Sequence, residues 1–322
     1  MTFRPKNDSE PLRDAERTAR KDLLDRRGDR VFWTGRLSSS ALATATAASA
    51  LSLISRDRFS ELIEGAVRWL REDQNEDGGW GDTPASPSNI PTTLLAEAAL
   101  CLSGCETRKC LRETEDYLDQ WAGSGAAERV RTLQDIYGSD RTFAAPILAN
   151  CGLAADYGDG RVPESLKVDW SDVPGLPFEL GCLPHGLLRT LNLGVVSYAL
   201  PALIAIGQLI HRRRPRNGPL RHLARCAASR PTLRRLQRIQ PESGGFLEAV
   251  PLTSFVTMSL AATGRARHQV CEKGIEFLRD RRRNDGSWPI DTNLSHWVTT
   301  QAVEALTAAG HDFGFEAEQL KE

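Results

Sequence analysis

Several signals that assign a protein to a class are missing from this sequence of 322 residues. Residues 1–30 are dense in charge of both signs and contain no apolar core of the kind that a signal peptide needs. The longest apolar run, residues 195–210, is interrupted by polar residues and is shorter than the roughly 20 residues that span a bilayer. We therefore expect neither secretion nor a transmembrane helix, and predict a cytoplasmic protein.

Net charge and cysteine spacing also argue against some classes of function, and they indicate none. The formal net charge is −1, which gives no global sign of nucleic-acid binding. The seven cysteines form no C-x-x-C pair, and together with the six histidines they show no ligand spacing that we recognise. Reduced thiols are the expectation for such a chain. We predict no metal and no other cofactor.

What the sequence does contain is an internal repeat. Residues 63–80, IEGAVRWLREDQNEDGGW, align without gaps on residues 271–288, CEKGIEFLRDRRRNDGSW. A weaker copy, LRRLQRIQPESGGF, occupies residues 233–246. Each copy is followed by small and apolar residues at helical spacing, so the unit reads helix, glycine-rich corner, helix. Residues 32–54 have a Trp-x-Gly corner and a following helix, and are interpreted as an incomplete opening unit.

The two helices of a unit differ in character. The helix before a corner carries Arg, Glu and Asp on one side, which is typical of an outer, solvated helix. The helix after a corner is rich in Ala, Thr and Leu and nearly uncharged, apart from Glu97, Glu248 and Glu304. Few segments show the alternation expected of strands. The pattern predicts an all-α fold, an (α/α) barrel or α-α toroid, with two layers of helices.

The residue types at a corner follow from its expected geometry. Glycine allows the positive φ of a tight turn after a helix, and the indole that follows covers the helix end. A glutamine in the last turn can bond to carbonyl groups and link one unit to the next. We therefore expect the corners to be structural. The residues assigned to them are Trp69, Gln74, Gly78, Trp80, Gln240, Gly244, Phe246, Gly286 and Trp288.

The pattern aromatic-Leu-x-x-x-Gln-x-x-x-Gly-x-Trp is met in full by Trp69, Leu70, Gln74, Gly78 and Trp80. It resembles the QW repeat of squalene-hopene and oxidosqualene cyclases, and the copy at 271–288 departs from it by having Arg282 in place of Gln. The stretches WTGRLSSSAL, GGFLEAVPLTSFVTMSLAATG and DGSWPIDTNLSHWVTT are also similar to that family. The similarity covers nearly the whole chain after about residue 30 and resembles the amino-terminal half of such cyclases.

The resemblance implies a domain plan and a function. Members of the family are triterpene cyclases, which are isomerases, with two α/α barrels, one of which carries an Asp-x-Asp-Asp acid. Residues 1–30 would be a charged tail, and residues 31–322 the barrel that lacks the acid. The chain would complete a squalene cavity and be inactive alone, with the acid on a second cyclase subunit or a missing C-terminal half. The alternatives are a non-catalytic isoprenoid-binding or scaffolding barrel and a zinc-binding prenyltransferase β-subunit relative.

The acid itself is absent from the sequence. No Asp-x-Asp-Asp occurs, and the nearest clusters, DYLD at 116–119 and DWSD at 169–172, are interpreted as exposed structure. What remains is a wall for a polyprenyl substrate such as squalene, where aromatic faces meet carbocations through their negative quadrupole. The candidate cavity-lining residues, which ordinary core packing would also explain, are Trp33, Phe178, Tyr198, Phe255 and Trp297.

The segment 211–238 is the most one-sided part of the chain, with ten arginines and no acid. It is either a solvated surface helix and linker or a patch for an anionic membrane surface, which would make the protein peripheral at the inner membrane. It lacks the interleaved aromatic residues that favour nucleic acid, so no nucleic-acid partner is predicted. The residues assigned to the patch are Arg212, Arg213, Arg214 and Arg216.

Overall fold

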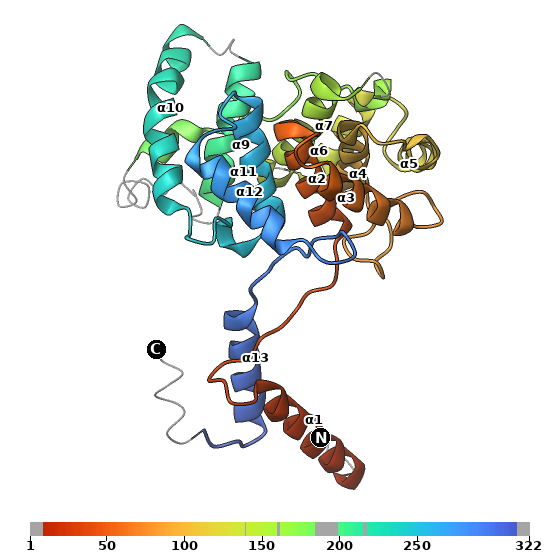
Figure 1. Ribbon diagram of the computed structural model, residues 1–322, viewed down its shortest axis with the longest axis vertical. Helices are drawn as coiled ribbons and strands as arrows, with labels where there is room; N and C mark the ends of the chain where they lie inside the picture. Colours follow the sequence, from red (N-terminus) through yellow and green to blue (C-terminus); the bar gives the residue numbers. More distant parts are fainter. Residues whose placement is uncertain (1–8, 139, 160–161, 184–198, 215–217, 314–322) are drawn as a thin grey trace, which may run out of the picture. The chain divides into compact units, whose positions relative to one another are not determined.

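The structure is a computed structural model that describes residues 9–138, 140–159, 162–183, 199–214 and 218–313 (Figure 1). These residues are helical apart from turns, loops and two isolated antiparallel bridges, and they contain no strand. Their contacts divide the chain into two compact units, residues 38–291 and residues 1–37 with 292–322. The predicted all-α class is confirmed.

Five helices of the larger unit form an inner ring. Their contacts run from α2 to α4, α7, α9 and α11, and α11 packs back on α2, so the ring is closed. The members are α2 (Ala41–Ser55), α4 (Ile90–Ser103), α7 (Arg141–Tyr157), α9 (Leu200–Arg213) and α11 (Val250–Ala262).

A second layer of helices surrounds this ring. Helix α3 packs on α2 and α4, and α5, α6, α10 and α12 pack on α4, α7, α9 and α11 in that order. These outer helices are α3 (Ser60–Glu72), α5 (Arg108–Trp121), α6 (Ala126–Tyr137), α10 (Pro219–Ile239) and α12 (Gln269–Arg281). Short 3-10 helices are η1 (Glu164–Leu166), η2 (Phe178–Cys182) and η4 (Phe246–Glu248). The two-layered α/α barrel predicted from the sequence is confirmed.

Small side chains and capped helix ends explain why these segments form the inner ring. Helix α2 is buried on all sides for most of its length and consists almost entirely of Ala, Ser, Thr and Leu, whose small members allow helix axes to approach closely. Ser40 and Asn89 cap α2 and α4 by accepting a backbone N–H, and proline stands in the first turns of α4, α9 and α11. Charged outer helices α3 and α5 then cover this apolar ring, as binary patterning requires.

The smaller unit contains α1 (Ser9–Arg27) and α13 (Ser295–Ala308). Its core is Trp33, Ala302 and Leu306, with Leu23 and Val298 packed against them. This differs from the sequence analysis, which treated residues 31–322 as one barrel and assigned the helix after Trp288 to the inner ring. The physical reason is the exchange of helix partners described below.

No helix in the described ranges is both long and apolar enough to cross a membrane.

Candidate functional site: barrel corners and a histidine pocket

Three corners join an outer helix to the segment that follows it: the first corner (73–82), the second corner (240–249) and the third corner (282–291). At the first, the Gln74 side-chain amide donates to the carbonyl oxygens of Gly78, at 2.8 Å, and Cys110, at 3.2 Å. It also lies 3.1 Å from the Thr114 hydroxyl, so one side chain ties the end of α3 to helix α5. Gln240 repeats the arrangement with Gly244, at 2.9 Å, and with the α12 residue Val270, at 3.0 Å.

The tryptophans of the first and third corners are fully buried and reach back along the chain. The Trp80 indole N–H donates to the Leu70 carbonyl at 2.9 Å, and the Trp288 indole N–H donates to the Leu278 carbonyl at 2.7 Å. Each indole thus satisfies a carbonyl near the C-terminus of an outer helix, where intrahelical partners run out. The structural role expected of these residues agrees with this geometry.

The corner glycines are required on two grounds. Their φ angles are +87° at Gly78, +83° at Gly244 and +94° at Gly286, a region that side-chain-bearing residues rarely adopt. In addition, a Cβ at these positions would lie 2.1, 2.3 and 2.5 Å from a backbone oxygen of the next outer helix. The oxygens belong to Glu113 in α5, Lys273 in α12 and Gly65 in α3. Each corner therefore docks on a neighbouring outer helix, and the third closes the outer layer on α3.

Arg282, which replaces the expected glutamine at the third corner, makes a different link to the same neighbour. Its guanidinium lies 3.0 Å from the position that a Cβ on Gly65 would take. It also lies 3.9 Å from the Glu61 carboxylate, so both contacts are to helix α3. The departure from the repeat pattern changes the bonding group but keeps the attachment between the first and last outer helices.

The backbone N–H of a corner tryptophan identifies the inner helix that packs against that corner. The Trp80 backbone N–H donates to the hydroxyl of Thr93, on the next helix α4, at 3.0 Å. The Trp288 N–H instead donates to the hydroxyl of Thr44 on α2, at 3.0 Å. Helix α2 therefore packs against the third corner, although it lies near the other end of the sequence.

A fourth corner with the same geometry lies in the smaller unit. The Trp33 indole N–H donates to the Leu23 carbonyl at 2.7 Å, and the Trp33 backbone N–H donates to the Thr299 hydroxyl at 2.9 Å. Helix α13 thus serves the corner that follows α1. Helix α2 follows Trp33 in sequence and helix α13 follows Trp288, but each of them bonds to the other's corner. This exchange was not predicted from the sequence, because the repeat pattern does not show which corner a helix joins.

The described residues among the five predicted to line a cavity divide between the two units, two in the smaller unit and two in the barrel. Trp33 is a buried corner residue, and Trp297, on α13 of the same unit, is 63% exposed. Phe178 in η2 is fully buried, and Phe255 on α11 is partly buried against the core, both in the barrel. Tyr198 lies outside the described residues. A cavity role for these side chains stays a prediction.

The inner ring contains one fully buried acid with a defined partner. Both carboxylate oxygens of Glu97 lie within hydrogen-bonding distance of Arg129, at 3.1 and 3.3 Å. Arg129 is 2% exposed and also pairs with Asp119 at 2.9 Å. Burial raises the pKa of Glu97 to about 7, while Arg129 acts in the opposite direction. The pair joins α4 to α6.

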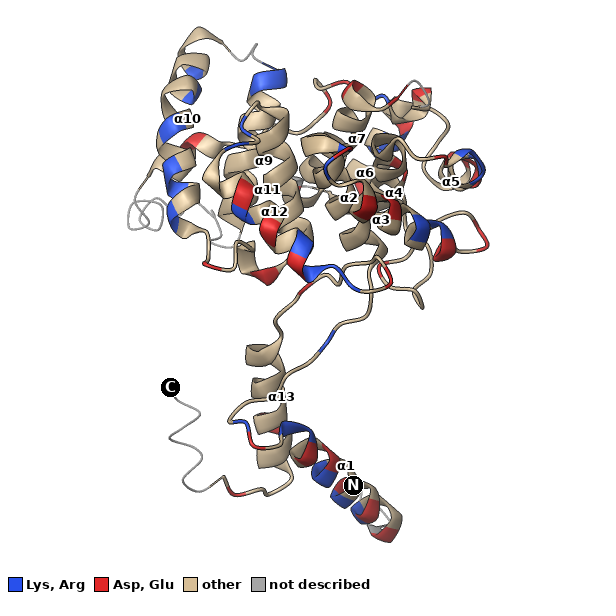
Figure 2. Cartoon of the chain, viewed as in Figure 1, with Lys and Arg blue, Asp and Glu red and all other residues tan. Residues whose placement is uncertain are grey.

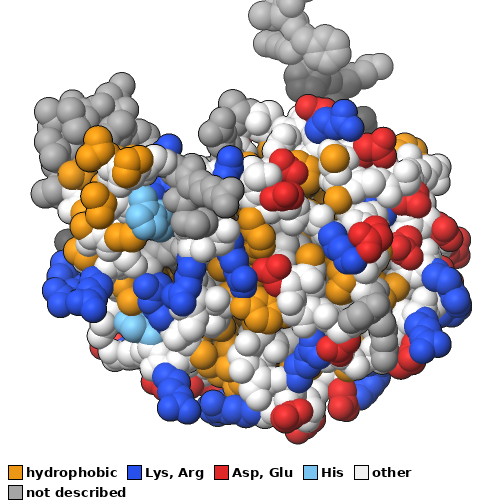
Figure 3. Space-filling view, turned by 90° about the horizontal axis from the view of Figure 1, so that it is seen from above, with side chains coloured by type: hydrophobic (Ala, Val, Ile, Leu, Met, Phe, Trp, Pro, Cys, Tyr) orange, Lys and Arg blue, Asp and Glu red, His pale blue; other side chains and the backbone are white. Residues whose placement is uncertain are grey.

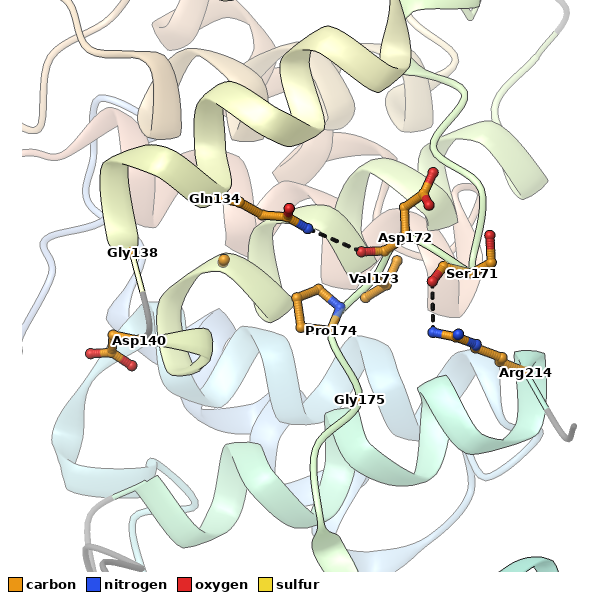
Figure 4. Close-up of a pocket in the computed structure, with 10 residues that line it drawn as sticks. Gln134, Gly138, Asp140, Ser171, Asp172, Val173, Pro174, Gly175 and Arg214 are labelled. Atoms are coloured by element: carbon orange, nitrogen blue, oxygen red, sulfur yellow. Dashed lines mark hydrogen bonds between the residues drawn. The ribbon is translucent and has the colours of Figure 1, made fainter. Parts of the chain in front are cut away.

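One polar pocket, of about 320 Å³, lies among the ends of α6, α7 and α9 and the loop 171–175 (Figure 4). Gln134 donates to the Asp172 carbonyl at 3.4 Å, and Arg214 donates to the Ser171 carbonyl at 2.6 Å. Asp140 caps helix α7 by accepting the Thr142 N–H at 2.9 Å. These groups hold the loop in place, and their arrangement offers no acid and base facing each other.

A second pocket, of about 350 Å³, is lined by titratable groups from α9 and α10. His211 is 9% exposed, and its ring lies 5.1 Å from that of His222 and 5.9 Å from that of Phe178. Burial, with the cation of Arg225, lowers the pKa of His211, so its neutral form is favoured. The Cys226 sulfur lies 3.5 Å from His222 Nε2 and 3.9 Å from His211 Nε2. This group was not predicted from the sequence, although His222 and Cys226 are four apart on one helix.

The basic segment splits into two parts with different surroundings. Arg212 donates to the Thr263 carbonyl at 2.7 Å, and Arg214 bonds to Ser171. Arg213 lies 3.4 Å from the Asp156 carboxylate and donates to the Tyr157 hydroxyl at 2.6 Å. Arg216 lies outside the described residues. The predicted patch residues that are described are therefore bonded within the chain.

Several arginines of α10 are more open to solvent, whereas Arg225 on the same helix is buried. Arg230, Arg234 and Arg238 are exposed and follow one another at spacings of four, which places them on one face of the helix. Leu220 and Leu223, near the start of α10, are 83% and 64% exposed. Figure 2 shows Lys and Arg recurring along α10, and Figure 3 shows basic, hydrophobic and histidine side chains gathered on that side of the barrel.

Comparison with known proteins gives one family. A family model described as the squalene-hopene cyclase N-terminal domain matches residues 17–132. Residues 17–132 are therefore similar to the N-terminal domain of squalene-hopene cyclases. The matched stretch of that domain contains the Trp33 corner, the first corner and the Glu97–Arg129 pair, so the resemblance read from the repeats is confirmed there.

Other comparisons add little to the squalene-hopene cyclase assignment. A solved structure, described as a protein from Actinoplanes, is similar to this chain with 16% sequence identity and a TM-score of 0.37. That similarity covers 85% of this chain and 82% of the other, and its score is too low to assign a fold or a function. No curated protein matches the chain.

Proposed function

We propose that this chain supplies one barrel of a protonation-initiated polyene cyclase and completes its substrate cavity, the Asp-x-Asp-Asp acid being held by another polypeptide segment. The observation that carries the proposal is the corner geometry. It stands beside the family match over residues 17–132 and a closed ring of helices, and the indoles of the first and third corners bond in the same manner.

The smaller unit supports the need for a partner. It repeats the corner geometry at Trp33, and the helices described in this unit are α1 and α13. Trp297 on α13 is 63% exposed, and Val31 and Phe32, in the segment that follows α1, are 48% and 42% exposed, so several apolar side chains are open to solvent in a unit with a small core. The occupant we propose for this surface is the barrel that carries the acid, since cyclisation needs a protonated carboxylic acid that this sequence does not contain.

The association step can be tested directly. The chain is co-expressed with a tagged barrel that carries Asp-x-Asp-Asp, encoded beside it or taken from a squalene-hopene cyclase, and the two are co-purified. We expect retention of the native chain and loss of retention in Trp297→Ser. Trp121→Ser, which alters an equally exposed tryptophan (59%) on outer helix α5, is the control and should be retained. Failure of the native pair to associate would rule out the two-part enzyme.

Peripheral membrane association is the second part of the proposal. Exposed Arg230, Arg234 and Arg238, with the exposed Leu220 and Leu223, fit an anionic leaflet, where each arginine contributes on the order of 1 kcal/mol. The bonded state of Arg212, Arg213 and Arg214 moves the proposed contact from the predicted patch to the face of α10. A polyene substrate held in a bilayer would then lie close to the barrel.

A further inference from the structure

We propose that His211, His222 and Cys226 form a site for a zinc-class transition-metal ion in the groove between α9 and α10. Two imidazoles and one thiol are the side chains that such ions prefer. They meet from two helices: His211 from the last turn of α9, and His222 and Cys226 from successive turns of α10. Nothing in the proposed cyclase function requires or assigns this site.

The distances are close to those of a coordinated ion. With metal–nitrogen bonds near 2.0 Å and metal–sulfur bonds near 2.3 Å, tetrahedral ligand atoms lie roughly 3.3–3.6 Å apart. The Cys226 sulfur is 3.5 Å from His222 Nε2 and 3.9 Å from His211 Nε2, and the three ligand atoms lie within 4.8 Å of one another. Shifts of about an ångström or less, within the range of side-chain rotation, would complete the geometry.

The imidazoles have few competing bonds. The Nδ1 atoms of His211 and His222 are buried and have no hydrogen-bond partner among the described residues. His211 is more than nine-tenths buried, and an unsatisfied polar atom at such a position costs free energy. No described hydrogen bond at Nδ1 therefore fixes either ring, and the Nε2 atoms, which face the Cys226 sulfur, are the atoms that would bind the metal ion.

The surroundings define what the ion would accept as a further ligand. Three protein ligands leave one tetrahedral position open. The pocket of about 350 Å³ provides space for a further ligand at that position. Arg212 and Arg265 also line that pocket, and Arg265 is held there by Gln208, at 2.8 Å, and Ser229, at 3.1 Å. Nearby positive charge opposes a bare cation and favours a thiolate ligand together with water or a small anion in the open position.

Zinc and cobalt(II), each added alone to the full chelator-treated chain, test the site. We expect a single bound ion per chain, and for cobalt a thiolate-to-metal charge-transfer band. Cys226→Ser should abolish that band, and His222→Ala should weaken zinc binding by more than about tenfold. Cys182→Ser alters the other exposed cysteine and is the control that should bind as the native chain does. Circular dichroism of each variant confirms folding.

Three results would overturn the proposal. They are absence of zinc binding, zinc binding that Cys226→Ser and His222→Ala leave unchanged, and binding of inorganic phosphate by a metal-free chain that takes no zinc. The last result would assign the pocket to an anion held by Arg212 and Arg265. Because these readouts need neither squalene nor a partner barrel, their failure is separate from failure of the proposed cyclase function. Location at these residues also separates the site from the zinc that a prenyltransferase relative would bring.

Discussion

At the scale of single residues, each corner glycine is required for two reasons, its positive φ and its close contact with a neighbouring backbone oxygen. The free-energy cost of each can be measured separately. Gly286 combines a φ of +94° with a backbone oxygen 2.5 Å from any Cβ, whereas Gly264 has a φ of +76° and open space around it. Gly264→Ala should therefore cost only the strain of a left-handed residue, about 1–2 kcal/mol. Gly286→Ala should cost roughly 1–3 kcal/mol more, because α3 must move away from the corner.

Urea unfolding of both variants measures the difference through the shift in midpoint at constant m-value. Equal losses of unfolding free energy in Gly286→Ala and Gly264→Ala would show that a Cβ at position 286 does not clash with α3. The outer layer would then not close in the manner described.

The buried pair of Glu97 and Arg129 gives a prediction with a pH dependence. In Arg129→Met the Glu97 carboxylate loses its cation while fully buried, so its folded-state pKa rises further above the ordinary value of 4.5. A raised folded pKa means that the folded state binds the extra proton, and stability falls as pH rises from 4.5 through the folded pKa. The variant should lose about 3–5 kcal/mol at pH about 8 and clearly less at pH about 5.

Chemical denaturation at the two pH values decides this. Arg131→Met, which alters an exposed arginine on the same helix α6, is the control and should change stability by less than about 0.5 kcal/mol at both. A loss in Arg129→Met that does not depend on pH would mean that Glu97 stays ionised, or stays protonated, throughout that range.

At the scale of elements, helix α10 separates the two interpretations of the basic segment. Flotation with anionic vesicles at low salt should recover the native chain, and changing Arg230, Arg234 and Arg238 to Ser together should weaken recovery at least tenfold, since each charge near the leaflet contributes on the order of 1 kcal/mol. Changing Arg212, Arg213 and Arg214 should have a smaller effect on vesicle binding, because these side chains are bonded within the chain. Equal recovery of the native chain and the α10 variant would leave α10 as a solvated face.

The elements also show how far sequence could lead. The inner helices were predictable because Ala, Thr and Ser at buried positions leave a nearly uncharged pattern, and the corners because Gly and Trp recur at fixed spacing. The exchange of α2 and α13 was not predictable, because Thr44 and Thr299 are equivalent in the repeat and only tertiary contact assigns each to a corner. The pocket of His211, His222 and Cys226 was overlooked because one ligand comes from α9 and the other two from α10.

At the scale of the whole molecule, the chain contains a closed barrel and a smaller unit that repeats one barrel corner. Alkene protonation needs an acid held protonated, with neighbours that stabilise the charge left behind. Glu97 does not meet that requirement, because both its oxygens are bonded to Arg129. In the function proposed above, the chain contributes part of the cavity and the acid lies elsewhere.

Squalene cyclisation by reconstituted components tests this most directly. The chain, an Asp-x-Asp-Asp barrel and the two together are each incubated with squalene in anionic vesicles, and extracted products are separated by gas chromatography with mass detection. We expect polycyclic product from the pair and none from either part alone, with loss of product when the acid motif is changed to Asn. Cyclisation by this chain alone, or a stable pair that yields no product, would contradict the proposed function.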